Sequence, residues 1–156
     1  MNFLHIGRNL AMPKKQEKLP IELLEKIQST GAGYDLIRYI SLPDIFGSES
    51  DALLYFMGRS LARKFNLQAL GDIIFFFEKV GWGRLELFKE KSNKLEFHLL
   101  ADSVVQRLAM PIETEFRLEA GFLAEAISIL KGVECECVEE IRPKIHQVEF
   151  TVVFVE

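Results

Sequence analysis

The stretch FRLEAGFLAEAISILKGVECECVEEIRPKIHQVEFTVVFV, residues 116 to 155, decides the fold. From Phe116 to Leu130 its apolar residues recur at helical spacing, and Gly132 is placed to end that helix. Two stretches in which apolar and polar residues alternate follow, joined around Arg142-Pro143-Lys144. The segment therefore predicts a helix followed by a β-hairpin, and it contains no catalytic motif.

The predicted helix is apolar on two sides, with small residues between them. A helix with two apolar sides needs two partners to bury them, so we expect it to lie centrally, between a sheet and other helices. The two sides are Phe116, Ala120, Leu123, Ile127 and Leu130 on one, and Leu118, Phe122 and Ile129 on the other.

The faces of the hairpin fix its register. Residues with odd numbers face the core on the first strand (Val133, Cys135, Cys137), whereas those with even numbers do so on the second (Val148 to Phe154). A shift of one residue would turn one of these sets to solvent, so paired residue numbers must sum to an odd value. The same alternation places His146 on the face of Cys137 and turns Glu134, Glu136, Glu149 and Thr151 outward.

The rest of the chain predicts helices and a second hairpin. Residues 1–18 show no periodic pattern and are expected to form a flexible arm before one α+β domain, residues 19–156. Helices are predicted to start at Pro20, Tyr34 and Ser48 and to span residues 67–80, and Gly58 and Ala62 would let another backbone come close. Residues 84–91 and 94–100 alternate as a hairpin. The sequence therefore predicts an α+β fold, in which about five helices pack on an antiparallel four-stranded sheet made of two hairpins.

Composition excludes several classes of protein. The chain has 156 residues, 49% of them hydrophobic, and a formal charge of −4 with no long basic run, so no nucleic-acid partner is expected. Its longest apolar run, residues 73–77, is far shorter than the ~20 residues of a transmembrane segment. Cys135 and Cys137 lie too far apart along a strand to form a disulfide, and no signal peptide pattern is seen. We therefore expect a cytoplasmic protein.

Three stretches carry a resemblance to a known family. They are YDLIRYISLPDIFG (residues 34–47), LLYFMGRSLAR (53–63) and FRLEAGFLAE (116–125), and they resemble the uncharacterised YslB-like family of Firmicutes over most of the chain. The order of helices and hairpins is also similar to that of trafficking TRAPP subunits and of vinyl-reductase-like sensor domains. This TRAPP-subunit-like plan implies dimerisation through helices and an apolar pocket for an acyl chain or small aromatic compound.

A ligand pocket is the first candidate site. We expect aromatic side chains to line it, with two arginines four residues apart that could bind a carboxylate or phosphate. Ion pairs of these arginines and Arg38 with Asp35, Asp44 or Asp51 are the favoured interpretation. The expected pocket residues are Phe75, Phe76, Phe77, Trp82, Phe122, Arg59 and Arg63.

A metal site is the second candidate, formed by Cys135, Cys137 and His146 with Glu139 as a fourth ligand. Buried free cysteines commonly act as small apolar residues, so core packing is the favoured interpretation. The resemblance to sensor domains implies further cysteines where Phe116 and Val148 stand. No metal or other cofactor is therefore expected.

Two hypotheses of function follow. The first is a non-enzymatic domain that binds a small apolar or acyl-type ligand in an internal pocket. The second is a homodimeric protein-interaction or scaffold module without such a ligand. Sequence motifs of nucleophilic, metal-dependent or nucleotide-dependent enzymes are absent from the chain, so we expect no enzyme.

Overall fold

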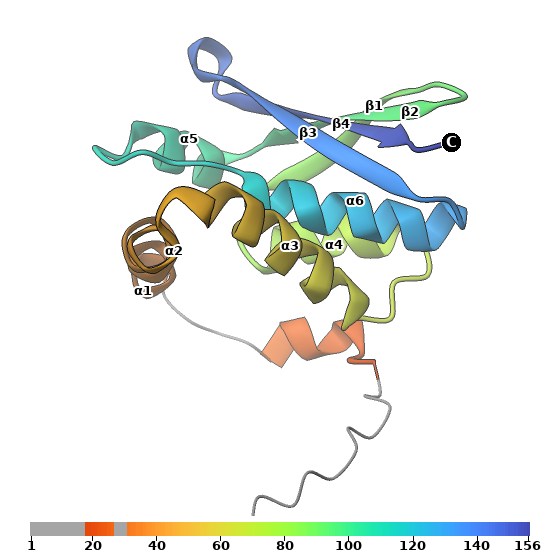
Figure 1. Cartoon of the computed structure of the whole chain (residues 1–156), viewed down its shortest axis with the longest axis horizontal. Coiled ribbons are helices and arrows are strands. Elements are labelled where there is room, and N and C mark those ends of the chain that lie inside the picture. The colour runs from red at the N-terminus through yellow and green to blue at the C-terminus, as the bar shows by residue number, and fades with distance from the viewer. Residues whose placement is uncertain (1–17, 27–30) are drawn as a thin grey trace, which may run out of the picture.

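The computed structural model describes residues 18–26 and 31–156. They form an α+β fold in which helices lie against one side of a four-stranded antiparallel sheet (Figure 1). The predicted N-terminal arm lies outside the described residues, except for Lys18. In chain order the elements are η1 (Ile21–Lys26), α1 (Gly31–Leu36), η2 (Ile37–Ser41), α2 (Leu42–Phe46), η3 (Gly47–Glu49), α3 (Ser50–Arg63), α4 (Leu70–Lys79), β1 (Arg84–Glu90), β2 (Lys94–Leu100), α5 (Asp102–Ala109), α6 (Arg117–Lys131), β3 (Cys135–Arg142), η4 (Pro143–Ile145) and β4 (Gln147–Phe154).

The helix α6 is the centre of the molecule, as its two apolar sides predict. One side packs on the sheet and the other on α3 (Figure 1). The two helices touch through their backbones, because a Cβ on Gly58 would overlap the carbonyl oxygen of Leu118, and one on Gly121 would overlap that of Tyr55. The prediction that Gly58 marks a close helix contact is confirmed.

The two hairpins join in one sheet of order β1-β2-β4-β3. In β3 and β4, Cys135 pairs with Phe154 and Cys137 with Val152, so paired numbers sum to an odd value and the predicted register is confirmed. The expected face of His146 is wrong. This residue lies in the turn before β4, exposed and with a positive φ of 49°, because Pro143 to Ile145 form a short 3₁₀ turn that ends the alternation.

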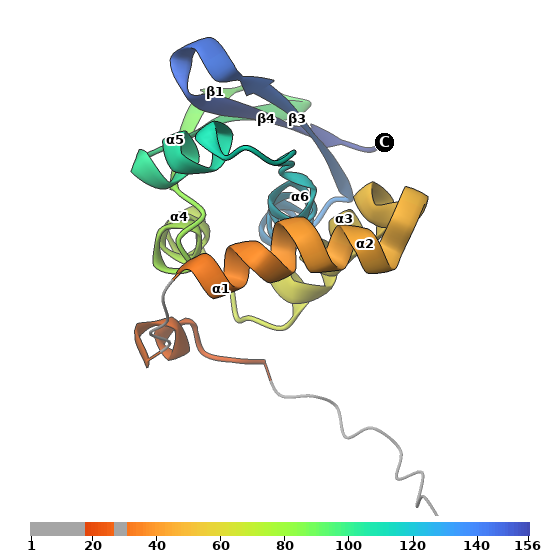
Figure 2. The same cartoon turned by 90° about the vertical axis from the view of Figure 1, so that its left-hand side faces the viewer.

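The helices at the N-terminal side do not bury the apolar face that the helical spacing of Tyr34, Ile37 and Ile40 predicts. Between α1 and α2 the chain makes a π-helical turn, in which the N–H of Leu42 bonds to the carbonyl of Ile37 and Pro43 follows without breaking the rod (Figure 2). The wider turn rotates the buried face, so that Arg38 and Tyr39 are buried whereas Ile37 and Ile40 are about half exposed.

Two other elements differ from the prediction. α4 begins at Leu70 rather than at residue 67, because the Asp72 carboxylate accepts hydrogen bonds from the N–H groups of Gln68 and Ala69, at 2.9 and 3.2 Å, and so caps the helix. The helix α5, which crosses from the first hairpin to α6, was not predicted. No helix in the described part of the chain is long and apolar enough to cross a membrane.

Candidate functional site

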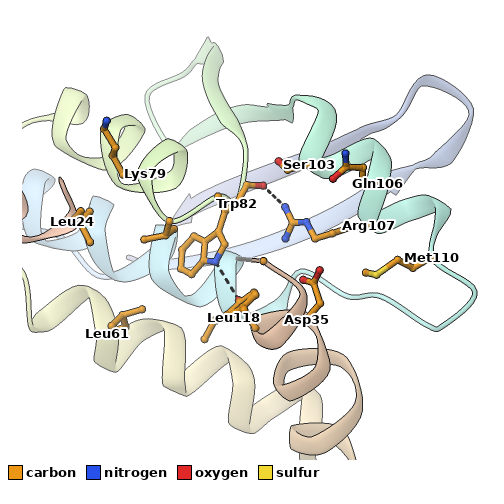
Figure 3. Close-up of a pocket in the computed structure, with 14 residues that line it drawn as sticks. Leu24, Asp35, Leu61, Lys79, Trp82, Ser103, Gln106, Arg107, Met110 and Leu118 are labelled. Atoms are coloured by element: carbon orange, nitrogen blue, oxygen red, sulfur yellow. Dashed lines mark hydrogen bonds between the residues drawn. The ribbon is translucent and has the colours of Figure 1, made fainter. Parts of the chain in front are cut away.

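A cavity of about 570 Å³ opens between α4, α5 and the N-terminal helices (Figure 3). Small-molecule sites commonly have volumes of ~300–1,000 Å³. Trp82, the sole tryptophan of the chain, forms part of its wall directly after α4. The lining residues are Leu24, Gly31, Tyr34, Asp35, Leu61, Lys79, Val80, Gly81, Trp82, Ser103, Gln106, Arg107, Met110 and Leu118.

One side of the cavity is apolar. Leu24 from η1, Leu61 from α3 and Leu118 from α6 lie there around the indole ring of Trp82 (Figure 3). The ring is buried, and its Nε1 donates a hydrogen bond to the hydroxyl of Tyr34 at 3.2 Å. The bond fixes the orientation of the indole at the cavity wall.

The other side of the cavity is polar, and α5 provides it. Ser103, Gln106 and Arg107 line the cavity from positions i, i+3 and i+4 of one helix face, and Met110 lines it directly after the helix ends (Figure 3). Three of these four side chains can donate hydrogen bonds. The cavity therefore offers apolar surface on one side and hydrogen-bond donors on the other.

Behind this polar side lies a network of buried charges. Arg107 donates through Nη1 to Glu119 at 2.9 Å and through Nη2 to the carbonyl oxygen of Trp82. The second oxygen of Glu119 accepts a hydrogen bond from Arg38 at 2.9 Å, and Arg38 also pairs with Glu115 at 2.9 Å. Arg38 and Glu119 are fully buried, so one carboxylate bridges two guanidinium groups out of contact with water.

Three buried nitrogen atoms of the network have no hydrogen-bond partner among residues 18–26 and 31–156. These are Nε of Arg107 and both Nε and Nη1 of Arg38. Such atoms are uncommon, since most buried polar groups are hydrogen-bonded. The two guanidinium groups thus retain capacity to donate beyond the contacts that they make.

In the arginines and in Glu115, burial and the oppositely charged neighbours shift the pKa in opposite directions. Burial acts to lower the pKa of both arginines, but the neighbouring glutamates raise it above the ordinary value, so both stay charged. Burial raises the pKa of Glu115 to about 7, although Arg38 opposes the shift. It also raises the pKa of Tyr34. The network therefore contains a carboxyl group that titrates near neutrality.

The aromatic residues of the predicted pocket form a cluster, of which Trp82 alone lines this cavity. Phe76 stacks on Phe122 with ring centroids 4.2 Å apart, and Trp82 lies 5.1 to 5.4 Å from Phe76, Phe77 and Phe122. Phe75 is half-buried, with the ammonium group of Lys79 5.4 Å from its ring centroid. The structure thus places Phe76, Phe77 and Phe122 in packed core around Trp82, and none of them is among the residues that line the cavity.

The structure separates the two predicted arginines from the cavity beside Trp82. Arg59 and Arg63 lie on α3 and pair with Glu125, at 3.1 and 3.3 Å, and Arg59 also pairs with Glu136 at 3.2 Å. With Phe56 they line a separate, open hollow. The prediction that these arginines and Arg38 pair with nearby aspartates is wrong, because α6 and β3 bring glutamates closer. These partners lie more than sixty residues away in sequence.

The predicted metal ligands do not converge. Cys135 and Cys137 are buried free thiols whose pKa values burial raises, whereas His146 is exposed in the turn before β4. Within residues 18–26 and 31–156, no three His, Cys, Asp or Glu side chains are grouped so that they could hold a metal ion.

Arg107, Glu115 and Glu119 were not predicted as site residues. The signal for Glu119 was present, because it is an acidic residue within a helix that is apolar on two sides. Arg107 carried a weaker signal, the amphipathic spacing of the short segment DSVVQRLA, residues 102–109. Neither pattern shows that the two residues meet.

Comparisons with known proteins agree with this fold. The model of a family described as "Protein of unknown function (DUF2507)" matches residues 31–153. The chain is 36% identical over 139 residues to the uncharacterized protein YslB of Bacillus subtilis (strain 168), covering 89% of this chain and 94% of that protein. It is 23% identical over 107 residues to the uncharacterized protein MJ1642 of Methanocaldococcus jannaschii, covering 68% and 65% of the two chains.

A solved structure shares the fold. The crystal structure of a vinyl-4-reductase family protein from Methanocaldococcus jannaschii superposes with a TM-score of 0.62 at 16% sequence identity. The match covers 87% of this chain and 88% of the other. At this identity the likeness shows the fold alone.

Proposed function

The chain belongs to the DUF2507 family, and we propose that it is a non-enzymatic domain that binds a small apolar or acyl-type ligand in the cavity beside Trp82. The observation that carries the proposal is the open space of about 570 Å³ against a buried indole. Ligand sites are typically concave, mainly apolar and of this size, with a few polar groups on their walls. The cavity beside Trp82 has these properties, which supports a ligand as its occupant.

The lining favours binding over catalysis. Ser103 lies on the polar side, but neither a histidine nor a cysteine that could form a nucleophile and base pair is among the described lining residues. Arg107 is engaged with Glu119 and the Trp82 carbonyl, which suits a group that positions a ligand.

Native mass spectrometry of the purified protein, followed by organic extraction, tests the proposal. We expect a stoichiometric adduct whose released compound is apolar or contains an acyl chain. Leu61→Trp should abolish the adduct because Leu61 lines the cavity, whereas Leu53→Trp on the same helix should retain it because Leu53 is not among the lining residues. Absence of an adduct, together with no change in Trp82 emission on adding apolar compounds, would contradict the proposal.

A second candidate function is a homodimeric protein-interaction module. The observation in its favour is a set of large apolar side chains left exposed along η2, α2 and α3, such as Ile37 (57% exposed), Ile45 (74%) and Phe56 (63%). Apolar surface gathered on neighbouring elements marks interaction sites more often than isolated exposed residues do.

Analytical ultracentrifugation tests this candidate. The expected result is a dimer that Phe56→Glu dissociates, whereas Phe88→Glu on β1, a residue with the same exposed fraction of 63%, leaves it intact. A wild-type protein that stays monomeric at micromolar concentrations would exclude the homodimer.

A further inference from the structure

Building on the proposed function, we infer the chemical class of the ligand: it is an amphiphilic carboxylic acid. Its carboxylate lies against the polar face of α5 at Arg107, and its apolar body lies along Trp82 and the leucines of the opposite side (Figure 3).

The two sides of the cavity call for an amphiphile. Ser103, Gln106 and Arg107 line it from one helix, whereas Leu24 and Leu61 come from elements on the other side of the indole (Figure 3). A wholly apolar compound would leave the donors of α5 without acceptors, and burying such groups unpaired is costly. A wholly polar compound would leave the leucine side in contact with water.

The donors favour an anionic head group. Arg107 is 5% exposed and lines the cavity, and Glu119 and the Trp82 carbonyl hold its guanidinium group, so it brings a fixed positive charge to the polar side. Charge-assisted bonds from a buried guanidinium are stronger than neutral ones, and its planar fork matches a carboxylate. The other charged lining residues add no net charge to the cavity: Asp35 lies on the side of Arg107, and Lys79 lies on the side of Leu24 (Figure 3).

The charge of the network limits the ligand to one negative charge. Arg107 and Arg38 share Glu119, and of these two arginines Arg38 contacts Glu115. With Glu115 ionised the two arginines and two glutamates sum to zero, and with Glu115 protonated they sum to +1. A monoanion can be balanced by proton uptake at Glu115, whereas a phosphate dianion would leave a negative charge buried. A carboxylate therefore fits better than a phosphate monoester.

Trp82 provides a direct assay, because it is the sole tryptophan and lies at the cavity wall. Its fluorescence is titrated with decanoate, 1-decanol and decylamine, each below its aggregation concentration. We expect decanoate to bind about tenfold more tightly than 1-decanol, the size of effect that a hydrogen-bonded charge adds. Decylamine should bind more weakly than either.

Charge variants locate the head group without breaking the network. Gln106 is exposed at the cavity edge, so Gln106→Glu should fold normally and weaken decanoate binding about tenfold through repulsion, leaving 1-decanol unchanged. Gln106→Lys should strengthen it. The matched control is Asn93→Asp, which adds the same charge in the β1–β2 turn, at the other end of the sheet from α5 (Figure 1).

The outcomes distinguish a failure of the ligand class from a failure of the proposed function. Equal binding of decanoate and 1-decanol, or tighter binding of decylamine, would overturn the carboxylic acid while the cavity proposal stands. Extraction of a neutral compound from the purified protein would do the same. If no probe changes the Trp82 signal and extraction releases nothing, the ligand class and the proposed function both fail.

Discussion

Replacing Gly58 by alanine should strongly destabilise the protein, because α3 and α6 touch at this residue. A Cβ at Gly58 would overlap the carbonyl oxygen of Leu118 and lie 2.7 Å from the amide nitrogen of Phe122. Both neighbours are backbone atoms, so no side chain can rotate away. The two helices must separate along their contact, and this loosens the core around α6.

The magnitude follows from two opposing terms. Overpacking a core costs ~1–3 kcal/mol and sometimes more, and rigid backbone neighbours put this site at or above the top of that range. Alanine gains up to ~1 kcal/mol over glycine in a helix interior. We expect a net loss of at least about 2 kcal/mol in the free energy of unfolding, a large fraction of the ~5–15 kcal/mol typical of a domain.

Urea denaturation followed by circular dichroism and by Trp82 emission measures this loss. The matched control is Gly71→Ala in α4, where a Cβ would meet no atom within 4 Å, so the change should be neutral or slightly stabilising. A Gly58→Ala protein within about 0.5 kcal/mol of wild type would refute the close contact, since changes this small are typical of open surface positions.

Three further predictions concern buried polar groups. The folded state binds the proton of Glu115 more tightly than the unfolded state, because its pKa rises from 4.5 to about 7, so stability should fall as pH rises across that interval. In Glu115→Gln the fall in unfolding free energy between pH 5 and pH 8, measured by urea titration, should be about 2 kcal/mol smaller than in the wild type. Glu119→Ala should lower the unfolding free energy by ~3–5 kcal/mol in the same assay, because it leaves Arg38 and Arg107 without their shared carboxylate. Cys135 and Cys137 should react with a thiol reagent at pH 8 only as the protein unfolds, since burial shields both thiols and raises their pKa; rapid labelling without unfolding would contradict their burial.

The sheet and the central helix could be predicted because their signals are local. Alternation over β3 and β4 fixes the register by itself, since a shift of one residue would turn the set of either Cys135 or Phe150 to solvent. Gly58 is a local signal of the same kind, because a glycine inside a predicted helix indicates that another backbone comes close there. Such signals need no knowledge of which element lies opposite.

The cavity and its charges could not be predicted, because they depend on contacts between distant residues. Arg107 meets Tyr39 at a separation of 68 residues, and Arg38 meets Glu119 at a separation of 81. In the sequence, a single charged residue between apolar residues is as typical of a solvent-exposed helix face as of a buried ion pair. The consecutive phenylalanines before Trp82 suggested a pocket, whereas their close packing with one another depends on how α4 approaches α6.

The buried network explains why the polar side of the cavity can keep its shape. Pairing two arginines with one buried carboxylate stabilises the fold less than apolar packing of the same volume would, because all three charged groups lose their hydration. The network links η2, α5 and α6, and it reaches Trp82 through the carbonyl that Arg107 binds. Since these are the elements and the residue around the cavity, the ion pairs hold Arg107 at one position and one orientation. A short helix such as α5, with few buried side chains of its own, would not fix a guanidinium group in this way by packing alone.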